Sequence, residues 1–303
     1  MTTTDASGGA PEPTEEEIIS ALRAAGWLLE QETETCLERQ GFHTSLNAAF
    51  PDPDDLGKSR EVDVMAYREL YRNDEIRLSI GIRCLAECKQ SSMPYVLIGK
   101  PPSAYERERT KLEQLLRFDS VVTSKVKESD RVTRWKSEDA REFIGLNRIP
   151  EAPWKRDFVA TQMTRLERKA TWLADNRGIF DGLVYPLAKA TQYFRKNYRP
   201  NRVFHDRATD WATVQFLYPM VVTSSPIYRV DASSEYAIDK AKWVPMIRQL
   251  KSGSLNGTYV IDVVTYSALE EYLEKYVLAF GAAVQEIAES DPELFVTSGH
   301  EPT

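Results

Sequence analysis

The sequence predicts an α/β fold in which a mixed sheet is flanked by helices, with a helical insertion and an extended C-terminal strand–helix region. Three observations predict it. Apolar, β-branched runs typical of buried strands occur both early and late in the chain. Stretches with apolar residues at helical spacing separate them. The 303 residues are 42% hydrophobic and 28% charged, a globular composition long enough to bury a substantial core.

The N-terminal part is predicted to be a tail followed by two helices. Residues 1–13 are rich in Thr, Gly and Pro, which is typical of a disordered tail. Thr14 followed by Glu17 forms a capping-box pattern that starts the first helix. Gly26 is expected to interrupt this helix, and Gly41 to end the second one.

Three strands are then expected in sequence. Residues 42–50 favour a short strand, and residues 51–57 a loop. Residues 61–67 alternate polar and apolar side chains, as a half-buried strand does, and residues 78–89 are apolar enough for a central strand. We therefore expect the last two to form an extended hairpin around Asn73.

The second half is expected to be mostly helical before it returns to the sheet. The helical segments predicted are 106–118, 155–177 and 183–196, with a Pro-containing joint at 149–153 between the first two. The later strands predicted are 215–223, 226–231 and 259–265, followed by a helix that Ser267 and Glu270 cap. Because parallel strands need helical crossovers, we expect one domain over residues 14–295. Its parts would be a core of 27–100 plus 155–265, a helical insertion at about 105–150, a helix at 267–290 and a tail at 296–303.

The formal charge of −7 is distributed unevenly. Residues 1–34 and residues 270–303 each carry a net charge of −7, so the interior of the chain carries +7. A polyanionic partner is therefore not excluded, because the location of charge matters more than its total. No apolar run is long enough to cross a membrane, no signal peptide is visible, and three cysteines are too few for a disulfide framework. These features predict a cytoplasmic protein without a membrane partner.

Asp63, Glu87 and Lys89 are the residues whose pattern indicates chemistry. Residues two apart in a strand share a face, so Glu87 and Lys89 project together while Cys88 faces the opposite layer. Asp63 lies on the preceding strand and can lie beside Glu87. Two converging carboxylates provide hard oxygen ligands for Mg²⁺, which activates water and neutralises phosphoryl charge. A neighbouring ammonium stabilises the transition state, so the pattern predicts phosphodiester hydrolysis.

This arrangement resembles the PD-(D/E)xK nuclease superfamily, which has the restriction-endonuclease-like fold. The motif stands here as Val62-Asp63 and Glu87-Cys88-Lys89, with Val62 replacing the usual Pro. The 24-residue gap from Asp63 to Glu87 is on the long side. Related nucleases often carry a further Glu on the first core helix, about eleven residues before a Gly-aromatic pair, and Glu30 has that spacing. The resemblance covers residues 27–89 and extends more loosely to the strand at 215–223.

The resemblance implies a role for each motif residue. Asp63 and Glu87 would hold Mg²⁺, or alternatively Mn²⁺, with the backbone carbonyl of Cys88. Lys89 would position the water nucleophile, and Glu30 would orient a metal-bound water or a second metal. The implied activity is that of a metal-dependent endodeoxyribonuclease, and fold-level analogy suggests bacterial restriction, repair or defence. RNA as substrate stays open, as does assembly as a homodimer or in a larger complex.

Two alternatives stand beside this interpretation. Glu87 and Lys89 can form a structural ion pair, as many such pairs do. The chain can also be a non-catalytic nucleic-acid-binding or scaffold subunit that keeps a nuclease-like fold.

Basic residues outside the motif are candidates for nucleic-acid contacts. Segment 189–207 interleaves basic and aromatic side chains, a pattern typical of phosphate contact and base stacking. The alternative is a solvated helix end with its aromatic residues in the core. A second basic stretch, 125–136, can likewise be either a nucleic-acid contact or a solvated segment. Asp262 lies in an apolar run and is expected to have a buried hydrogen-bonding or charged partner. The contact candidates are Lys58, Arg60, Arg195, Lys196, Arg199 and Arg202.

Overall fold

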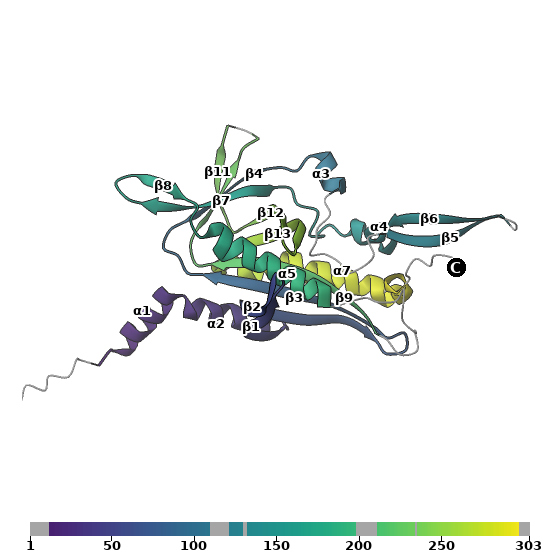
Figure 1. The fold of residues 1–303 in the computed structure, drawn as a ribbon, viewed down its shortest axis with the longest axis horizontal. Coiled ribbons are helices and arrows are strands. Elements are labelled where there is room, and N and C mark those ends of the chain that lie inside the picture. The colour runs from purple at the N-terminus through teal and green to yellow at the C-terminus, as the bar shows by residue number, and fades with distance from the viewer. Residues whose placement is uncertain (1–11, 110–120, 130–131, 198–210, 234, 297–303) are drawn as a thin grey trace, which may run out of the picture.

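The computed structural model describes residues 12–109, 121–129, 132–197, 211–233 and 235–296. Its architecture is α/β, with one large mixed sheet flanked by helices (Figure 1). The predicted fold class is thereby confirmed at this level. None of the described helices is long and apolar enough to cross a membrane.

The large sheet has eleven strands in the order β1-β2-β3-β9-β13-β12-β7-β4-β10-β11, with β8 paired to β7. Strand β9 runs parallel to both β3 and β13, whereas β1, β2 and β3 form an antiparallel meander. The bounds are β1 His43–Asp52, β2 Asp55–Asn73, β3 Leu78–Lys89, β4 Tyr95–Lys100, β7 Val159–Arg168, β8 Trp172–Asp175, β9 Ala212–Thr223, β10 Ile227–Asp231, β11 Ala237–Ala241, β12 Trp243–Ser252 and β13 Leu255–Thr265. A separate hairpin consists of β5 Val121–Ser129 and β6 Val132–Asp139.

Helices cover both faces of this sheet. The α-helices are α1 Glu15–Ala25, α2 Trp27–Arg39, α3 Ala104–Arg109, α4 Ala140–Ile144, α5 Tyr185–Asn197, α6 Leu269–Tyr272 and α7 Ala279–Ser290. A π-helical turn, Leu273–Leu278, joins α6 to α7 without a break, and another, Phe180–Val184, leads into α5. Short 3₁₀ turns lie at Leu146–Arg148, Tyr266–Ala268 and Pro292–Phe295.

Two apolar cores lie on opposite sides of the central strands. One packs α2, α6 and α7 against β3 and β9, and it contains Leu37, Ile82 and Phe280. The other packs α5 against the opposite face and against β12 and β7, and it contains Leu187 and Ile261. Figure 1 shows α5 lying across one face of the sheet. It belongs to the connection from β3 to β9, and this parallel pair requires such a crossover.

Most sequence predictions for the described residues up to 90 are confirmed, but the loop predicted at 51–57 is wrong. Residues 51–52 and 55–57 belong to β1 and β2, and only residues 53–54 form the turn between them. The Thr14 and Glu17 capping box is formed, and Gly26 breaks the helix in the left-handed conformation at φ 91°. That conformation favours glycine because a side chain would clash with the backbone. Strand β3 has the predicted bounds, because every residue from Leu78 to Cys88 is buried between the two cores. Strand β2 ends at Asn73, so the extended hairpin also forms.

The helical prediction for residues 155–177 is wrong. This segment forms the antiparallel β7–β8 hairpin, whose strands pair from Arg165↔Asp175 to Arg168↔Trp172. The predicted helical stretch 105–150 contains the short helices α3 and α4 and also the β5–β6 hairpin, so it is not mainly helical where it is described. Residues 110–120 lie outside the described residues. The predicted strands 215–223, 226–231 and 259–265 correspond to β9, β10 and β13 and are confirmed.

Candidate functional site

Glu87 and Lys89 lie at the end of the central strand β3 and point to the same face. Their side chains form an ion pair with 3.2 Å between Lys89 Nζ and Glu87 Oε2. Cys88 points to the opposite layer, where its thiol lies 3.5 Å from the Thr33 hydroxyl of α2. The strand alternation predicted from the sequence is therefore confirmed, and Cys88 is a core thiol.

Asp63 lies beside this pair because β2 and β3 separate at this level. Their antiparallel ladder ends at Val64↔Ala86, although β3 stays paired with β9 as far as Lys89. The Cys88 amide is thus left without a β2 backbone partner, and it donates a hydrogen bond of 2.7 Å to Asp63 Oδ2. In a strand, the carbonyl of a residue points to the same side as its amide, so the Cys88 carbonyl also faces the gap.

Helix α2 places Glu30 near the same three residues. Leu29 and Leu37 are buried and fix the inner face of the helix, and Glu30 lies half-buried at the edge of this face. Burial raises the pKa of Glu30, and the negative charge of Asp63 adds to the rise, whereas Lys89 opposes it. Glu30 therefore feels the charges of both Asp63 and Lys89.

The cluster holds more negative charge than Lys89 balances. Burial raises the pKa of Glu87 to about 7, and repulsion from Asp63 and Glu30 contributes to the rise even though Lys89 opposes it. Burial alone would lower the pKa of Lys89, but the carboxylates of Glu87 and Asp63 raise it above its ordinary value. Lys89 therefore stays protonated, and a further cation would relieve the repulsion among the three carboxylates.

The donor set fits a cation that needs few protein ligands. Within the described residues, no group of three or more His, Cys, Asp or Glu side chains forms a ready-made metal cage. Mg²⁺ is usually held by only one or two carboxylates, with water and substrate phosphate completing its shell. Asp63 uses Oδ2 for the Cys88 amide, and Glu87 uses Oε2 for Lys89. The other oxygen of each carboxylate and the Cys88 carbonyl match such a shell.

The two basic contact candidates on β2 are paired with acidic residues away from this cluster. Lys58 pairs with Asp55 at 2.9 Å, and Arg60 Nε lies 2.6 Å from Asp52 Oδ2. Arg195 is half-buried on α5. The side chain of Lys196, all of Arg199 and Arg202, and the side chains of the basic stretch 125–136 lie outside what the structure describes.

Two charged residues that the sequence singles out, Lys189 and Asp262, are buried and paired inside the fold. Lys189 is 3% exposed and binds Asp52 and Asp54, so it stabilises the β1–β2 hairpin against α5. Asp262 accepts hydrogen bonds from Arg156 at 3.1 Å and from the Tyr272 hydroxyl at 2.7 Å. The buried partner predicted for Asp262 is thereby confirmed.

A groove beside the cluster contains residues that the sequence analysis missed. It has a volume of about 710 Å³ and begins at Gln90, the residue after Lys89. Its other walls are the end of α1, the turn after β3 and the β7–β8 hairpin. The available signal was the basic composition of residues 165–169, which the helical prediction for this segment obscured. The lining residues are Ala24, Gln90, Ser91, Ser92, Met93, Arg165, Glu167, Arg168 and Lys169.

Comparisons of the chain with protein-family models, with curated proteins and with solved structures find no match.

Proposed function

We propose that this protein is a metal-dependent nuclease that hydrolyses phosphodiester bonds of DNA. The observation that carries the proposal is the hydrogen bond from the Cys88 amide to Asp63 at the end of the β2–β3 ladder. It holds Asp63 at the level of the buried Glu87 and of Lys89, which are the neighbours of Cys88 on β3. The electrostatic influence of Glu30 and Asp63 on Glu87 supports the same grouping.

The strand order agrees with what the resemblance to the PD-(D/E)xK superfamily implies. Helix α2 is followed by the antiparallel meander β1-β2-β3, and β9 then adds parallel to β3 after the crossover helix α5. The Asp motif lies on β2 and the Glu-x-Lys motif on β3. We therefore propose a restriction-endonuclease-like core formed by β1, β2, β3 and β9, with the remaining strands added beyond it.

Each residue of the cluster has a role in the proposed reaction. Asp63, Glu87 and the Cys88 carbonyl would hold Mg²⁺ or Mn²⁺, which supplies charge neutralisation at the phosphate and an acidified water. Lys89 is protonated and 34% exposed at its side chain, so it can donate to the attacking water and to a phosphoryl oxygen. Glu30 would orient a water at the edge of the site.

The test is Mg²⁺-dependent cleavage of plasmid DNA by the wild-type protein and by Asp63→Ala and Lys89→Ala. Each variant should lose activity by at least about 100-fold, as expected when a group that stabilises the transition state is removed. Glu61→Ala and Lys100→Ala are matched controls, because both residues are exposed, on β2 and β4 respectively. Equal cleavage by all five proteins, or no cleavage by any, would refute the proposal.

A second candidate is a non-catalytic subunit that binds nucleic acid or serves as a scaffold. The observation that favours it is that no cage of three or more metal-binding side chains is formed by the described residues. Calorimetric titration separates the two functions. A nuclease binds Mg²⁺ or Mn²⁺ and loses this binding in Asp63→Ala, whereas the non-catalytic subunit binds DNA without binding either metal.

A further inference from the structure

The groove beside the carboxylate cluster lies next to the proposed reaction centre. Gln90 follows Lys89 directly and lines the groove. Gly26, at the joint between α1 and α2, packs against the Gln90 side chain. Tyr95, buried at the start of β4, provides a second link. Burial raises the pKa of its hydroxyl, while the positive charges of Arg165 and Lys89 both oppose the rise. Tyr95 therefore lies within the electrostatic reach of both Arg165 of the groove wall and Lys89 of the cluster.

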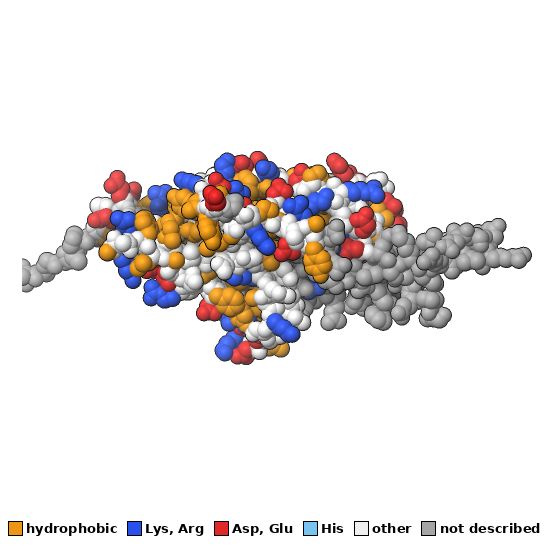
Figure 2. Space-filling view, turned by 90° about the horizontal axis from the view of Figure 1, so that it is seen from above, with side chains coloured by type: hydrophobic (Ala, Val, Ile, Leu, Met, Phe, Trp, Pro, Cys, Tyr) orange, Lys and Arg blue, Asp and Glu red, His pale blue; other side chains and the backbone are white. Residues whose placement is uncertain are grey.

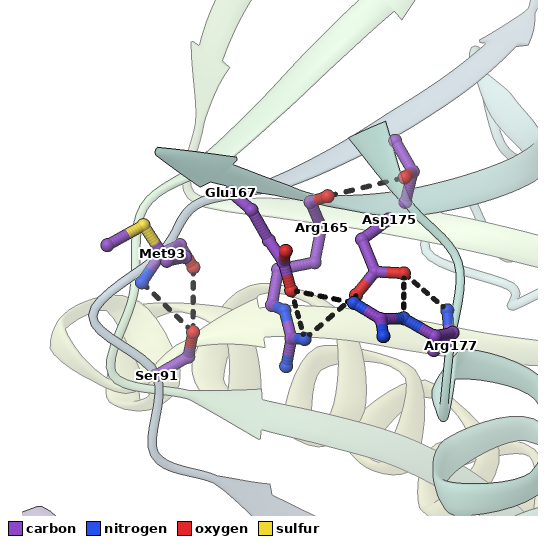
Figure 3. A network of polar contacts seen from close by, with 7 residues as sticks. Ser91, Met93, Arg165, Glu167, Asp175 and Arg177 are labelled. Carbon is purple, nitrogen blue, oxygen red and sulfur yellow. Dashed lines mark hydrogen bonds and ion pairs between the residues drawn. The ribbon is translucent and has the colours of Figure 1, made fainter. Parts of the chain in front are cut away.

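The base of the β7–β8 hairpin is a fixed wall (Figure 3). Arg165 lies 3.1 Å from Glu167 and 3.2 Å from Asp175, and Arg177 lies 2.9 Å from Asp175. Across the groove, the Ser91 hydroxyl donates to the Met93 carbonyl at 2.8 Å and accepts from its amide at 3.0 Å. The two arginines and two carboxylates balance one another, so this network shapes the groove without adding net charge.

The tip of the hairpin carries unbalanced positive charge. Arg168 and Lys169 are exposed, and no acidic partner for either is found in the described part of the chain. The Arg168 guanidinium lies 5.3 Å from the centre of the Trp172 ring, and Trp172 is itself 51% exposed. Figure 2 shows an apolar patch at the end of the molecule where α1 and the β8 hairpin lie. An exposed Arg over an exposed Trp presents a cation and an aromatic face together, and this combination suits a strand of nucleic acid.

We propose that this groove binds the sugar–phosphate backbone of DNA next to the phosphate that is cleaved. Arg168 and Lys169 would contact phosphates, and Trp172 would stack on a sugar or a base. An anionic strand would leave the carboxylate cluster past Gln90 and follow the basic side of the groove. The role in orienting a scissile strand rests on the proposed nuclease function, whereas the binding itself does not.

Binding is measured by fluorescence anisotropy with a labelled DNA duplex of about 30 base pairs in EDTA, at several salt concentrations. The double variant Arg168→Ala/Lys169→Ala should raise Kd roughly 10-fold or more at low salt and reduce the salt slope by about two, one for each lost phosphate contact. The matched control is Lys155→Ala/Lys251→Ala, which removes two exposed lysines outside the groove and should leave Kd and slope near wild type. Trp172→Ala should weaken binding with an unchanged salt slope.

The outcomes separate the groove from the nuclease. An unchanged Kd and salt slope in the Arg168→Ala/Lys169→Ala variant overturns the groove proposal, even if the wild-type protein cleaves DNA. An equal loss of DNA affinity in the control variant also overturns the groove proposal, because the loss would then follow from the removal of positive charge in general and not from the groove. Weakened binding in the first variant alone, with a wild-type protein that never cleaves DNA, supports the groove and refutes the nuclease. Thermal melting of each variant checks that these exposed changes leave the fold intact.

Discussion

Lys189→Met should destabilise the protein strongly, although the sequence places this lysine in a basic, aromatic stretch suited to nucleic-acid contact. In the structure its side chain is 4% exposed. Its ammonium lies 2.6 and 2.9 Å from the two Asp52 oxygens and 2.9 Å from Asp54 Oδ2. The substitution keeps an apolar side chain of similar length and removes only the charge that joins α5 to the β1–β2 hairpin.

The expected cost follows from what the substitution leaves behind. Breaking a buried ion pair by removing one partner typically costs about 3–5 kcal/mol, because the other charge stays buried. Asp52 is 2% exposed, but it keeps Arg60 at 2.6 Å and the Asp54 amide at 2.9 Å. We therefore expect a loss near the lower end, about 3 kcal/mol, out of a total stability of about 5–15 kcal/mol.

The pair also predicts a dependence of stability on pH. Burial alone would raise the pKa of Asp52, but hydrogen bonds from Lys189, the Asp54 amide and Arg60 hold it well below its ordinary value. Since the carboxyl is more acidic when folded, its stabilising effect is present above its unfolded pKa of about 4 and is lost as the pH falls below that value. Lys189→Met should make this acid loss of stability smaller.

Urea unfolding of the wild-type protein, Lys189→Met, Asp52→Asn and the double variant, at pH 7 and pH 4, measures both effects. A coupling energy between the two sites should emerge at pH 7 and shrink at pH 4. DNA binding should be unchanged under conditions where the single variant is folded. A loss below about 1 kcal/mol at pH 7, the value of an exposed pair, would refute the reasoning.

Three further substitutions test packing elsewhere. Tyr272→Phe removes the hydrogen bond of 2.7 Å to buried Asp262 and should cost about 1–3 kcal/mol in urea unfolding; a neutral effect would show that Arg156 alone satisfies the carboxylate. Gly26→Ala places a side chain at φ 91° and should lower the melting midpoint by the equivalent of about 1–2 kcal/mol, with no change if the joint can relax. Gly81→Ala would set a Cβ 2.5 Å from the Tyr67 ring and should cost about 1–3 kcal/mol, whereas a small effect would mean that the ring moves aside.

The proposed reaction centre could be placed from the sequence because its local structure is set by strong local patterns. The segment from Leu78 to Cys88 is mostly apolar and contains β-branched residues, which is typical of a central strand, and all of it is buried between the two cores. Alternation along that strand then fixes that Glu87 and Lys89 share a face. The position of Glu30 at the edge of the inner face of α2 follows from its helical spacing relative to Leu37, which is fully buried.

The β7–β8 hairpin could not be predicted because its burial pattern imitates a helix. The buried residues of β7 occur in two adjacent pairs, Val159 with Ala160 and Met163 with Thr164. A regular half-buried strand would alternate instead, but β7 pairs with β4 through a shift in register at Ile98/Gly99. Pairs of buried residues four apart match helical spacing, and the bulge that causes them depends on a distant strand. The groove was missed for the same reason.

The β2–β3 ladder ends next to the residues that we propose as the reaction centre. If pairing continued past Val64↔Ala86, the next residues in register would be Asp63 and Glu87. Two carboxylates directly opposite each other in a ladder destabilise it. The strands separate there instead, and Asp63 takes the place of a backbone acceptor for Cys88. The separation therefore replaces an unfavourable ladder pair by a hydrogen bond to Asp63, which stays close enough to act on the charge of Glu87. The groove begins two residues after Cys88, at Gln90.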